Sequence, residues 1–444
     1  MALDQHTNPD PAPSRGENLP RSAGRRRAWT VLALLFGLLL VNFADKVVVG
    51  LAGVDMKRDL GIDDEAFGVI QSSFYWLFAV GCVLGGWLGG RIGARWLLAG
   101  IAVVWALSLA PMVGQVGFTT VVACRVLLGF AEGPTTALAM QVTHSWFPAH
   151  RRALPSSLLV AGATVGPVIA APALTWVITQ YSWHAAFGVL AAVGALMAVL
   201  WLIGGREGPE GASAGHGEGA GASIVLPERL PLGRILRTGT LIGMTLLFFV
   251  AYANTSVKIS WLPLYLREGL GYDAETTGRL VALPYVGAAV AVIVVGVISR
   301  SMTKRGLSSR TSRGLLAGSL VLGAGVATLI FPVLDRGAPQ MILIVLSSCL
   351  NSAGYGIAFT GLADIVPAAQ RGTVFGIVTG VYSLGGIIAP MVVGSLVSGG
   401  SSVAAGYGDG FLVLGLTMIA GAVAALFLVH PERDAAKLAA ARPA

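Results

Sequence analysis

Long apolar stretches separated by short polar segments run along the chain from Trp29 to His430. An α-helix needs about 20 apolar residues to cross the hydrocarbon core of a bilayer. Stretches of this length occur twelve times. We predict membrane-spanning helices over residues 29–54, 66–89, 93–113, 117–145, 153–180, 184–204, 238–267, 277–299, 313–333, 339–365, 372–398 and 409–430. The pattern therefore indicates an all-α membrane protein.

The composition supports this interpretation. Of the 444 residues, 55% are hydrophobic and 12% are charged, which lies outside the range of soluble globular proteins. The 60 glycines suit a membrane, where small residues let helix backbones approach closely. We expect a packing seam at Gly85, Gly86, Gly89, Gly90 and Gly93. Three cysteines within predicted spans indicate packing residues rather than disulfides or a metal cluster: Cys82, Cys124 and Cys349.

Polar segments divide the chain into units. The first 28 residues are polar and end in a run of arginines. A secretory signal is the alternative, but the apolar stretch that follows is too long and no small-residue cleavage site closes it. A Gly, Ala and Ser run over residues 208–223 predicts a flexible linker. We predict a disordered tail (1–28), a six-helix bundle (29–204), a linker (205–237), a second six-helix bundle (238–430) and a second tail (431–444).

An internal repeat supports the division into halves. Five residues recur at one offset of 219 without a gap: Pro148, Ala149, Arg152, Gly166 and Ala170 match Pro367, Ala368, Arg371, Gly385 and Ala389. Both copies run from a Pro and Arg loop into a Gly-rich span. Parallel six-helix halves around a central site form one large class of secondary transporter, so we predict two pseudo-symmetric six-helix bundles.

The distribution of basic residues predicts the orientation. Most of the 30 Lys and Arg residues fall in the tails, the linker and the loops on one side. Basic loops face the cytoplasm, so we expect both termini, both tails and the linker to be cytoplasmic. The net charge of +8 follows largely from this bias and indicates no nucleic-acid partner. The basic loop over residues 300–313 is expected to serve orientation and lipid contact.

Five charged residues lie deep within predicted spans, away from the span ends: Asp45, Lys46, Arg125, Glu132 and Lys258. Facing lipid, they would together cost on the order of 12 to 17 kcal/mol, so they are expected to face one another, a cavity or a substrate. Arg125 and Glu132 are seven residues apart and share a helix face. We predict that they converge with the other three on one aqueous chamber between the bundles.

Two interpretations of these charges remain open. They can form structural ion pairs, Arg125 with Glu132 and Asp45 with Lys46 or Arg125. Those pairs leave Lys258 without a partner. It either extends to the periplasmic interface or points inward, where the buried ammonium loses its proton or attracts an anion. In the second interpretation, a proton neutralises Glu132 or Asp45 and releases Arg125, with Lys46, to bind a substrate carboxylate. Proton and substrate would then favour each other's binding.

Polar and aromatic residues on neighbouring spans are candidates for the lining of the chamber. Asn254, Lys258 and Trp261 share one helix face, as do Asn351 and Tyr355. For any single aromatic residue, packing or an interfacial belt is the alternative. The full set of candidates is Asn42, Tyr75, Phe78, Asn254, Trp261, Tyr285, Asn351, Tyr355 and Tyr382.

Three stretches carry a resemblance to a known family. They are residues 42–46 (NFADK), residues 67–76 with Gly85-Gly86-Trp87, and residues 125–133 (RVLLGFAEG) with Trp146-Phe147-Pro148 and Arg152. Together they resemble the anion:cation symporter branch of the major facilitator superfamily, which includes bacterial sugar-acid carriers and sialin. Three positions depart from that pattern: Gly90 replaces an Asp that helps latch one conformation, Lys46 an Arg and Ala163 a Gln. The last change favours a less hydroxylated substrate.

The resemblance implies the superfamily fold and a proton-coupled symporter that imports a small organic anion by alternating access. In the carriers it resembles, the acids matching Asp45 and Glu132 are associated with protons, and the cation matching Arg125 with substrate. It implies a multi-pass protein of the bacterial inner membrane that functions as a monomer. Its partners would be a carboxylate substrate, protons and membrane lipid, with no cofactor.

Two other classes of function compete with import. Residues 162–171 partly resemble the fifth-helix signature of proton-coupled antiporters, which favours efflux of a metabolite or drug. The three cations within the spans count against cationic drugs. No phosphate-binding loop, metal-ligand spacing or nucleophile elbow is present, so we do not expect an enzyme.

Overall fold

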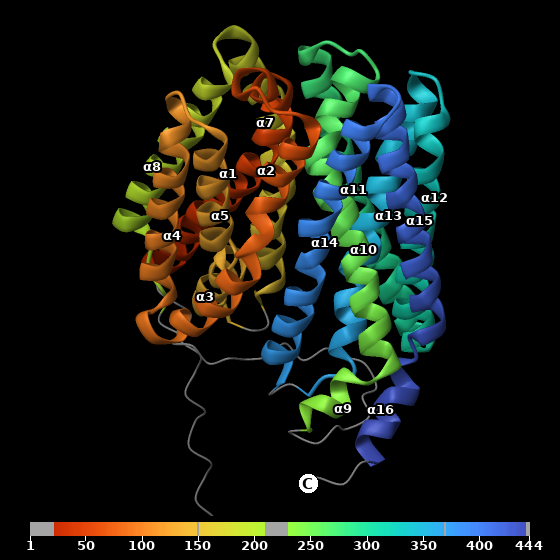
Figure 1. The fold of residues 1–444 in the computed structure, drawn as a ribbon. Coiled ribbons are helices and arrows are strands. Elements are labelled where there is room, and N and C mark those ends of the chain that lie inside the picture. The colour runs from red at the N-terminus through yellow and green to blue at the C-terminus, as the bar shows by residue number, and fades with distance from the viewer. Residues whose placement is uncertain (1–21, 149–150, 209–229, 368–369, 441–444) are drawn as a thin grey trace, which may run out of the picture.

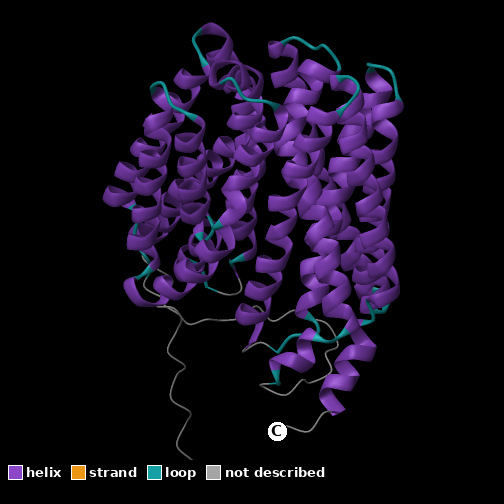
Figure 2. Ribbon diagram, in the orientation of Figure 1, coloured by secondary structure: helices purple, strands orange, loops and turns teal. Residues whose placement is uncertain are grey.

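The computed structural model describes residues 22–148, 151–208, 230–367 and 370–440, and these ranges are helical with short loops and no strand (Figures 1 and 2). Twelve helical segments are long and apolar enough to cross a membrane, which confirms the predicted all-α fold. The helices are α1 (Ser22–Leu60), α2 (Asp64–Trp76), α3 (Phe78–Ile92), α4 (Ala94–Leu109), α5 (Phe118–Glu132), α6 (Thr135–Trp146), α7 (Ala153–Gln180), α8 (Trp183–Gly204), α9 (Leu232–Leu236), α10 (Gly239–Leu264), α11 (Ala274–Lys304), α12 (Leu316–Ile330), α13 (Ala338–Ala363), α14 (Arg371–Gly399), α15 (Val403–Leu428) and α16 (Pro431–Ala440).

The second and fourth predicted spans are each interrupted once. The second divides into α2 and α3 at Leu77, and the fourth into α5 and α6 at Gly133 and Pro134. Proline lacks the N–H that would continue the hydrogen-bond ladder. The two interruptions touch, because a Cβ on Gly133 would lie 2.5 Å from the carbonyl oxygen of Phe78. The close backbone contact therefore positions α5 against the second span.

Two helices extend beyond the ends that the apolar pattern predicts. Helix α1 continues to Leu60, past the predicted end at residue 54, because Lys57 and Arg58 form ion pairs within and beyond it. Helix α15 begins at Val403, six residues before the predicted start, with Ser402 accepting a hydrogen bond from the backbone N–H of Ala405. Apolar length alone does not detect such ends.

The predicted tails and linker contain helices in their described parts. Helix α1 begins at Ser22, inside the segment predicted to be disordered, and α9 lies in the predicted linker. Helix α16 occupies the predicted C-terminal tail, and its buried Asp434 accepts hydrogen bonds from the backbone N–H and hydroxyl of Thr240 at the start of α10. Residues 1–21, 209–229 and 441–444, with the rest of these predictions, lie outside the described residues.

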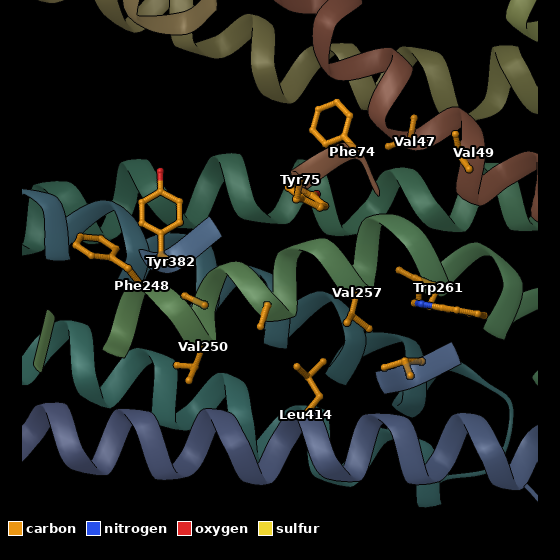
Figure 3. Close-up of a cluster of buried hydrophobic side chains, with 14 of the residues drawn as sticks. Val47, Val49, Phe74, Tyr75, Phe248, Val250, Val257, Trp261, Tyr382 and Leu414 are labelled. Carbon is orange, nitrogen blue, oxygen red and sulfur yellow. The ribbon is translucent and has the colours of Figure 1, made fainter. Parts of the chain in front are cut away.

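The helices gather in two groups (Figure 1), with α1–α8 in one and α10–α15 in the other. Helix α1 packs against α10, α2 and α3 pack against α14, and α7 packs against α11, so the groups meet along these helices. A buried apolar cluster crosses this boundary (Figure 3), with Val47, Phe74 and Tyr75 from the first group and Phe248 and Tyr382 from the second. The exact limits of the two predicted bundles stay a prediction.

The internal repeat has a structural counterpart. Arg152 donates from Nε to the carbonyl of Phe147 (2.8 Å) and from Nη2 to that of His144 (3.0 Å). Arg371, 219 positions on, donates from the same atoms to Val366 (3.3 Å) and Ala363 (3.1 Å). Each arginine satisfies carbonyls at the end of the preceding helix. The shared geometry supports duplication; Ala149 and Ala368 lie outside the described residues.

The predicted glycine seam is correct on one face only. A Cβ on Gly85 would overlap Pro134, and one on Gly89 would lie 2.7 Å from Leu138. Gly86 and Gly90 have open space around them. Gly93 has φ +81° and borders Glu207. The first pair lets α3 approach the helix pair α5 and α6, whereas Gly86 and Gly90 have no packing role.

We expect Gly129→Ala to lower the stability of the protein sharply. A Cβ at this position of α5 would overlap the carbonyl oxygen of Phe74 on α2, and forcing extra volume into a packed contact typically costs about 1–3 kcal/mol. Thermal unfolding in detergent should show a Tm several degrees below that of the unmodified protein. Gly86→Ala is the control, because its Cβ meets nothing. Equal Tm values for the two variants would contradict the packing argument.

Candidate functional site

An ion pair joins α1 to α5 inside the first group of helices. Lys46 Nζ lies 2.6 Å from Glu132 Oε2, and the side chains are 12% and 0% exposed. The same ammonium donates to Asn42 Oδ1 at 2.9 Å, one turn earlier on α1. It lies 4.3 Å from the ring centroid of Phe43. Lys46 is therefore neutralised by Glu132 and held by neighbouring polar and aromatic groups.

Asp45 lies beside this pair without a hydrogen bond of its own. The residue is fully buried, and neither carboxyl oxygen has a hydrogen-bond partner among the described residues. Glu132, Lys46 and Arg125 all interact with it electrostatically. Glu132 Oε1 likewise lacks a partner in the described part of the chain. Two carboxyl groups thus share a buried space with two cations, and only one acid is directly paired.

Arg125 on α5 has free hydrogen-bonding capacity. Its guanidinium lies over the ring of Phe74, 4.8 Å from the centroid. The residue is 3% exposed, and Nε and Nη1 have no acceptor among the described residues. Buried donors are normally satisfied, and a guanidinium matches a carboxylate with two parallel donors. The arrangement leaves Nε and Nη1, on two edges of the planar guanidinium, free to donate to an anion.

Lys258 forms a second cationic centre, in the other group of helices. The residue is 8% exposed, and Nζ donates to the hydroxyls of Ser347 (2.7 Å) and Ser348 (3.0 Å) on α13. Within the described ranges no acid pairs with it. The alternative in which this lysine extends to the membrane interface is therefore wrong, because its side chain is buried against α13. Hydroxyl groups solvate the ammonium but leave its charge uncompensated.

Lys258 borders a cavity of about 60 Å³ between α10, α11 and α13, which Tyr285 also lines. Both side-chain polar atoms of Asn254 are buried without a partner in the described chain. Asn351 donates to the carbonyl of Ala251 and to Thr255 Oγ1, both at 3.1 Å, while its own Oδ1 is free. The cavity therefore offers one cation, two amides and hydroxyls, which suits a small polar anion.

A row of tyrosine rings begins beside the Arg125 centre and crosses to the second helix group. Tyr75 lies 5.6 Å from Tyr252, which lies 4.9 Å from Tyr382, which lies 6.0 Å from Tyr355. Tyr75 follows Phe74, whose ring lies under the guanidinium of Arg125. Phe78 packs 6.3 Å from Tyr75. The tyrosines therefore link α2, beside Arg125, to α10, the helix that carries Lys258; Tyr75 and Tyr382 are labelled in Figure 3.

The structure corrects two sequence predictions. The expected pairs of Arg125 with Glu132, or of Asp45 with Lys46, are replaced by the pair of Lys46 with Glu132. Trp261 does not line the cavity: it is fully buried, donates from its indole to the carbonyl of Pro390 (3.1 Å) and packs on Phe67 (5.4 Å). Its bulk is part of the contact between the two groups.

Sequence reasoning missed Tyr252 and the serine partners of Lys258. Ser347 precedes Asn351 by four residues and Asn351 precedes Tyr355 by four, so helical periodicity could have detected the serine. Tyr252 stands out by no such spacing. The remaining candidates, Asn42, Tyr75, Phe78, Tyr285, Tyr355 and Tyr382, lie in the contacts described above.

Ion pairs connect the two groups at the end of α1 and α10. Lys57 bridges Asp64 (2.6 Å) and Glu268 (2.8 Å), and Arg267 pairs with Asp55 (3.2 Å). Glu268 also accepts a hydrogen bond from the hydroxyl of Tyr407 (3.0 Å). Helix α16 contacts the start of α10, so these pairs lie at the opposite end of the bundle. Ion pairs therefore join the two helix groups at the end of the bundle away from α16.

Comparisons with known proteins agree with this architecture. A sequence model of the Major Facilitator Superfamily matches residues 34–390. The chain is 25% identical over 437 residues to a probable galactarate/D-glucarate transporter of Bacillus subtilis, covering 92% of this chain and 94% of the relative. It is 24% identical over 436 residues to a D-galactonate transporter of Escherichia coli, with 93% and 98% covered. The crystal structure of a bacterial homologue of the human lysosomal transporter Spinster, inward-facing and occupied, superposes with a TM-score of 0.75 at 18% identity, covering 93% and 98%.

Proposed function

Since the chain belongs to the Major Facilitator Superfamily, we propose that it is a proton-coupled symporter that imports a small organic anion by alternating access. Membership makes it a multi-pass membrane transporter rather than an enzyme. The observation that carries the proposal is the pair of buried cations with unmet capacity, Arg125 and Lys258, one in each helix group.

The substrate is an organic acid. Buried cations without an acidic partner are costly, and a carboxylate relieves that cost at both centres. The names of the relatives include sugar acids with one carboxylate, galactonate, and with two, galactarate. These names support an organic acid as the substrate, but they do not distinguish an acid with one carboxylate from an acid with two. The expectation of a less hydroxylated substrate, which rests on Ala163, stays a prediction.

The proton binds at the acidic pair. Asp45 and Glu132 lie in the same buried space, where two ionised carboxylates repel each other. Because Lys46 already neutralises Glu132, a proton on Asp45 is the step that removes the anionic neighbour of Arg125. Arg125 then becomes available to a substrate carboxylate. This refines the sequence hypothesis, since a proton on Glu132 would free Lys46 instead.

The ion pairs of Lys57 and Arg267 support alternating access. With cytoplasmic termini, as the basic loops predict, these pairs lie on the periplasmic side and close it. Opening that side requires both cross-group pairs to separate, and substrate release requires the other side to open. We further propose a monomeric carrier of the bacterial inner membrane, with lipid around the exposed apolar surface.

Transport by purified protein in liposomes tests the function. With the lumen one pH unit above the outside, a labelled organic acid such as D-glucarate should accumulate, because each coupled proton supports about tenfold accumulation. Dissipating the gradient with a protonophore should abolish the accumulation. Accumulation only under the reversed gradient would favour the proton-coupled efflux antiporter, and indifference to pH would contradict proton coupling.

A further inference from the structure

We infer that the transported acid carries two anionic groups, one bound by Arg125 and the other by Lys258. This inference rests on the proposed function and narrows its substrate class to dicarboxylates and to carboxylates that carry a second acid such as a sulfonate. It follows from the balance of charge between the two centres, from their placement on opposite helix groups and from the free polar atoms around Lys258.

The balance of charge comes first. Lys46 and Glu132 form a neutral pair at 2.6 Å. Arg125 interacts with Asp45 and Glu132. Glu132 is already paired with Lys46, and Asp45 has no hydrogen bond among the described residues. Lys258 has hydroxyl partners and no acid in the described part of the chain. When a proton occupies Asp45, two positive charges therefore stand without a counter-charge, one in each helix group.

A substrate with one carboxylate leaves one of these charges unpaired. Burying a charge without a partner costs several kcal/mol after relaxation, so a monoanion would carry that cost through every occluded state. A dianion removes it at both centres. The loaded carrier, with one proton and one dianion, then has no uncompensated charge at Arg125 or Lys258.

The placement of the two cations fits a ligand that bridges the groups. Arg125 is on α5, over the ring of Phe74, and Lys258 is on α10, beside a cavity. Tyr75, which follows Phe74, packs 5.6 Å from Tyr252 on α10, so the first centre borders the helix that carries the second. A dianion held at both ends would draw the two groups together. Occupancy and closure would thus be linked through the substrate itself, which is the differential binding that a conformational change requires.

The second anionic group has further donors near Lys258. The amide of Asn254 is buried with both polar atoms unpaired, and its nitrogen can donate to an anion that enters the cavity. Ser348 and Tyr285 line the same space. An acid group at this point would receive charge from Lys258 and hydrogen bonds from neutral side chains. A substrate with a hydroxyl or methyl group at this end would leave the charge of the Lys258 ammonium uncompensated.

Matched ligands test the number of anionic groups. D-Glucarate and D-gluconate share a six-carbon hydroxylated chain, and adipate and hexanoate share an unsubstituted one, so each pair differs in one carboxylate. Calorimetry at pH 6 with the full-length protein should show the diacid of at least one pair binding about 30-fold or more tightly than its monoacid. Equal affinities within both pairs, or preference for both monoacids, would overturn the inference.

Variants then assign the second group to Lys258. In Lys258→Met, the affinity for the diacid should fall about 30-fold, to that of the monoacid, while the monoacid affinity stays within about twofold. Lys437→Met makes the same exchange on the exposed face of α16 and should keep the preference for the diacid. If Lys258→Met does not fold, Lys258→Gln is measured instead, and the ligand pairs on the unmodified protein decide the inference alone.

The outcomes separate this inference from the function on which it rests. Proton-driven uptake in which D-gluconate matches D-glucarate and hexanoate matches adipate, in both rate and affinity, would leave the symporter intact and contradict the dianion. A preference for the diacid that persists in Lys258→Met would contradict the assignment of Lys258 to the second group. Absence of uptake for every acid under either pH gradient would instead contradict the proposed function.

Discussion

Arg125→Lys is expected to weaken binding of the organic acid about 100-fold, with little change in the stability of the protein. Lysine keeps the positive charge but replaces a planar fork with a point charge. The Nε and Nη1 donors now lack an acceptor, and each charge-assisted hydrogen bond to a carboxylate is worth about 1.5–3 kcal/mol. Calorimetry with D-glucarate should show the loss, and Arg125→Met should show a larger one.

Arg336→Lys provides the matched control for this result. Arg336 also lies over an aromatic ring, with its guanidinium 3.8 Å from the centroid of Tyr272, but it is exposed and its Nη1 donates to the carbonyls of Leu270 and Gly271. The same exchange at this position should leave binding unchanged. Affinity within about twofold of the unmodified protein in Arg125→Lys would remove the guanidinium from substrate recognition.

The fold was accessible from sequence because the bilayer imposes it. About 20 apolar residues must be helical to satisfy the backbone in lipid, and twelve such stretches, with a repeat at offset 219, leave few alternatives. The repeat was readable because Arg152 and Arg371 perform the same task, satisfying carbonyls five and eight residues earlier. Membership of a transporter family followed from motifs in the first, second and fourth spans.

The partners of the buried charged residues were harder to predict from the sequence than the fold. Sequence placed Arg125 and Glu132 on one helix face, which suggested a pair, whereas the structure joins Glu132 to Lys46 on α1. Which cation reaches an acid on another helix depends on the rotation and depth of both helices, and these are set by contacts such as that of Gly129 with Phe74. The partner of a buried charge is therefore a property of packing, not of spacing.

Packing also explains why sequence spacing misplaced Trp261 and missed the serines beside Lys258. Helical spacing placed Trp261 on the face of Asn254 and Lys258, but a large ring at the end of α10 fills the contact with α2 and α14 instead. Ser347 and Ser348 carry no charge and were not predicted as site residues, although their hydroxyls accept hydrogen bonds from the Lys258 ammonium. Small hydroxyl residues become visible as site residues only once the partner is located.

Asp45→Asn should abolish uphill accumulation while leaving exchange of substrate across the membrane intact. Asparagine resembles the protonated acid, so Arg125 would stand permanently without its anionic neighbour. Substrate binding, which should tighten in the unmodified protein as the pH falls, would become strong and independent of pH. In liposomes with one pH unit across the membrane, the accumulation ratio should fall from about tenfold per proton to one, while counterflow of labelled against unlabelled acid continues.

Asp59→Asn and Glu132→Gln complete this experiment. Asp59 lies on the same helix but at its far end, where it accepts a hydrogen bond from the indole of Trp183 (2.8 Å), so its variant should accumulate substrate normally. Glu132→Gln leaves Lys46 without its acid and should lower stability as well as transport, whereas Asp45→Asn breaks no direct pair. Full pH-driven accumulation by Asp45→Asn, with loss only in Glu132→Gln, would move the proton site from Asp45 to Glu132. Retention of pH-driven accumulation by both variants would mean that neither acid carries the proton.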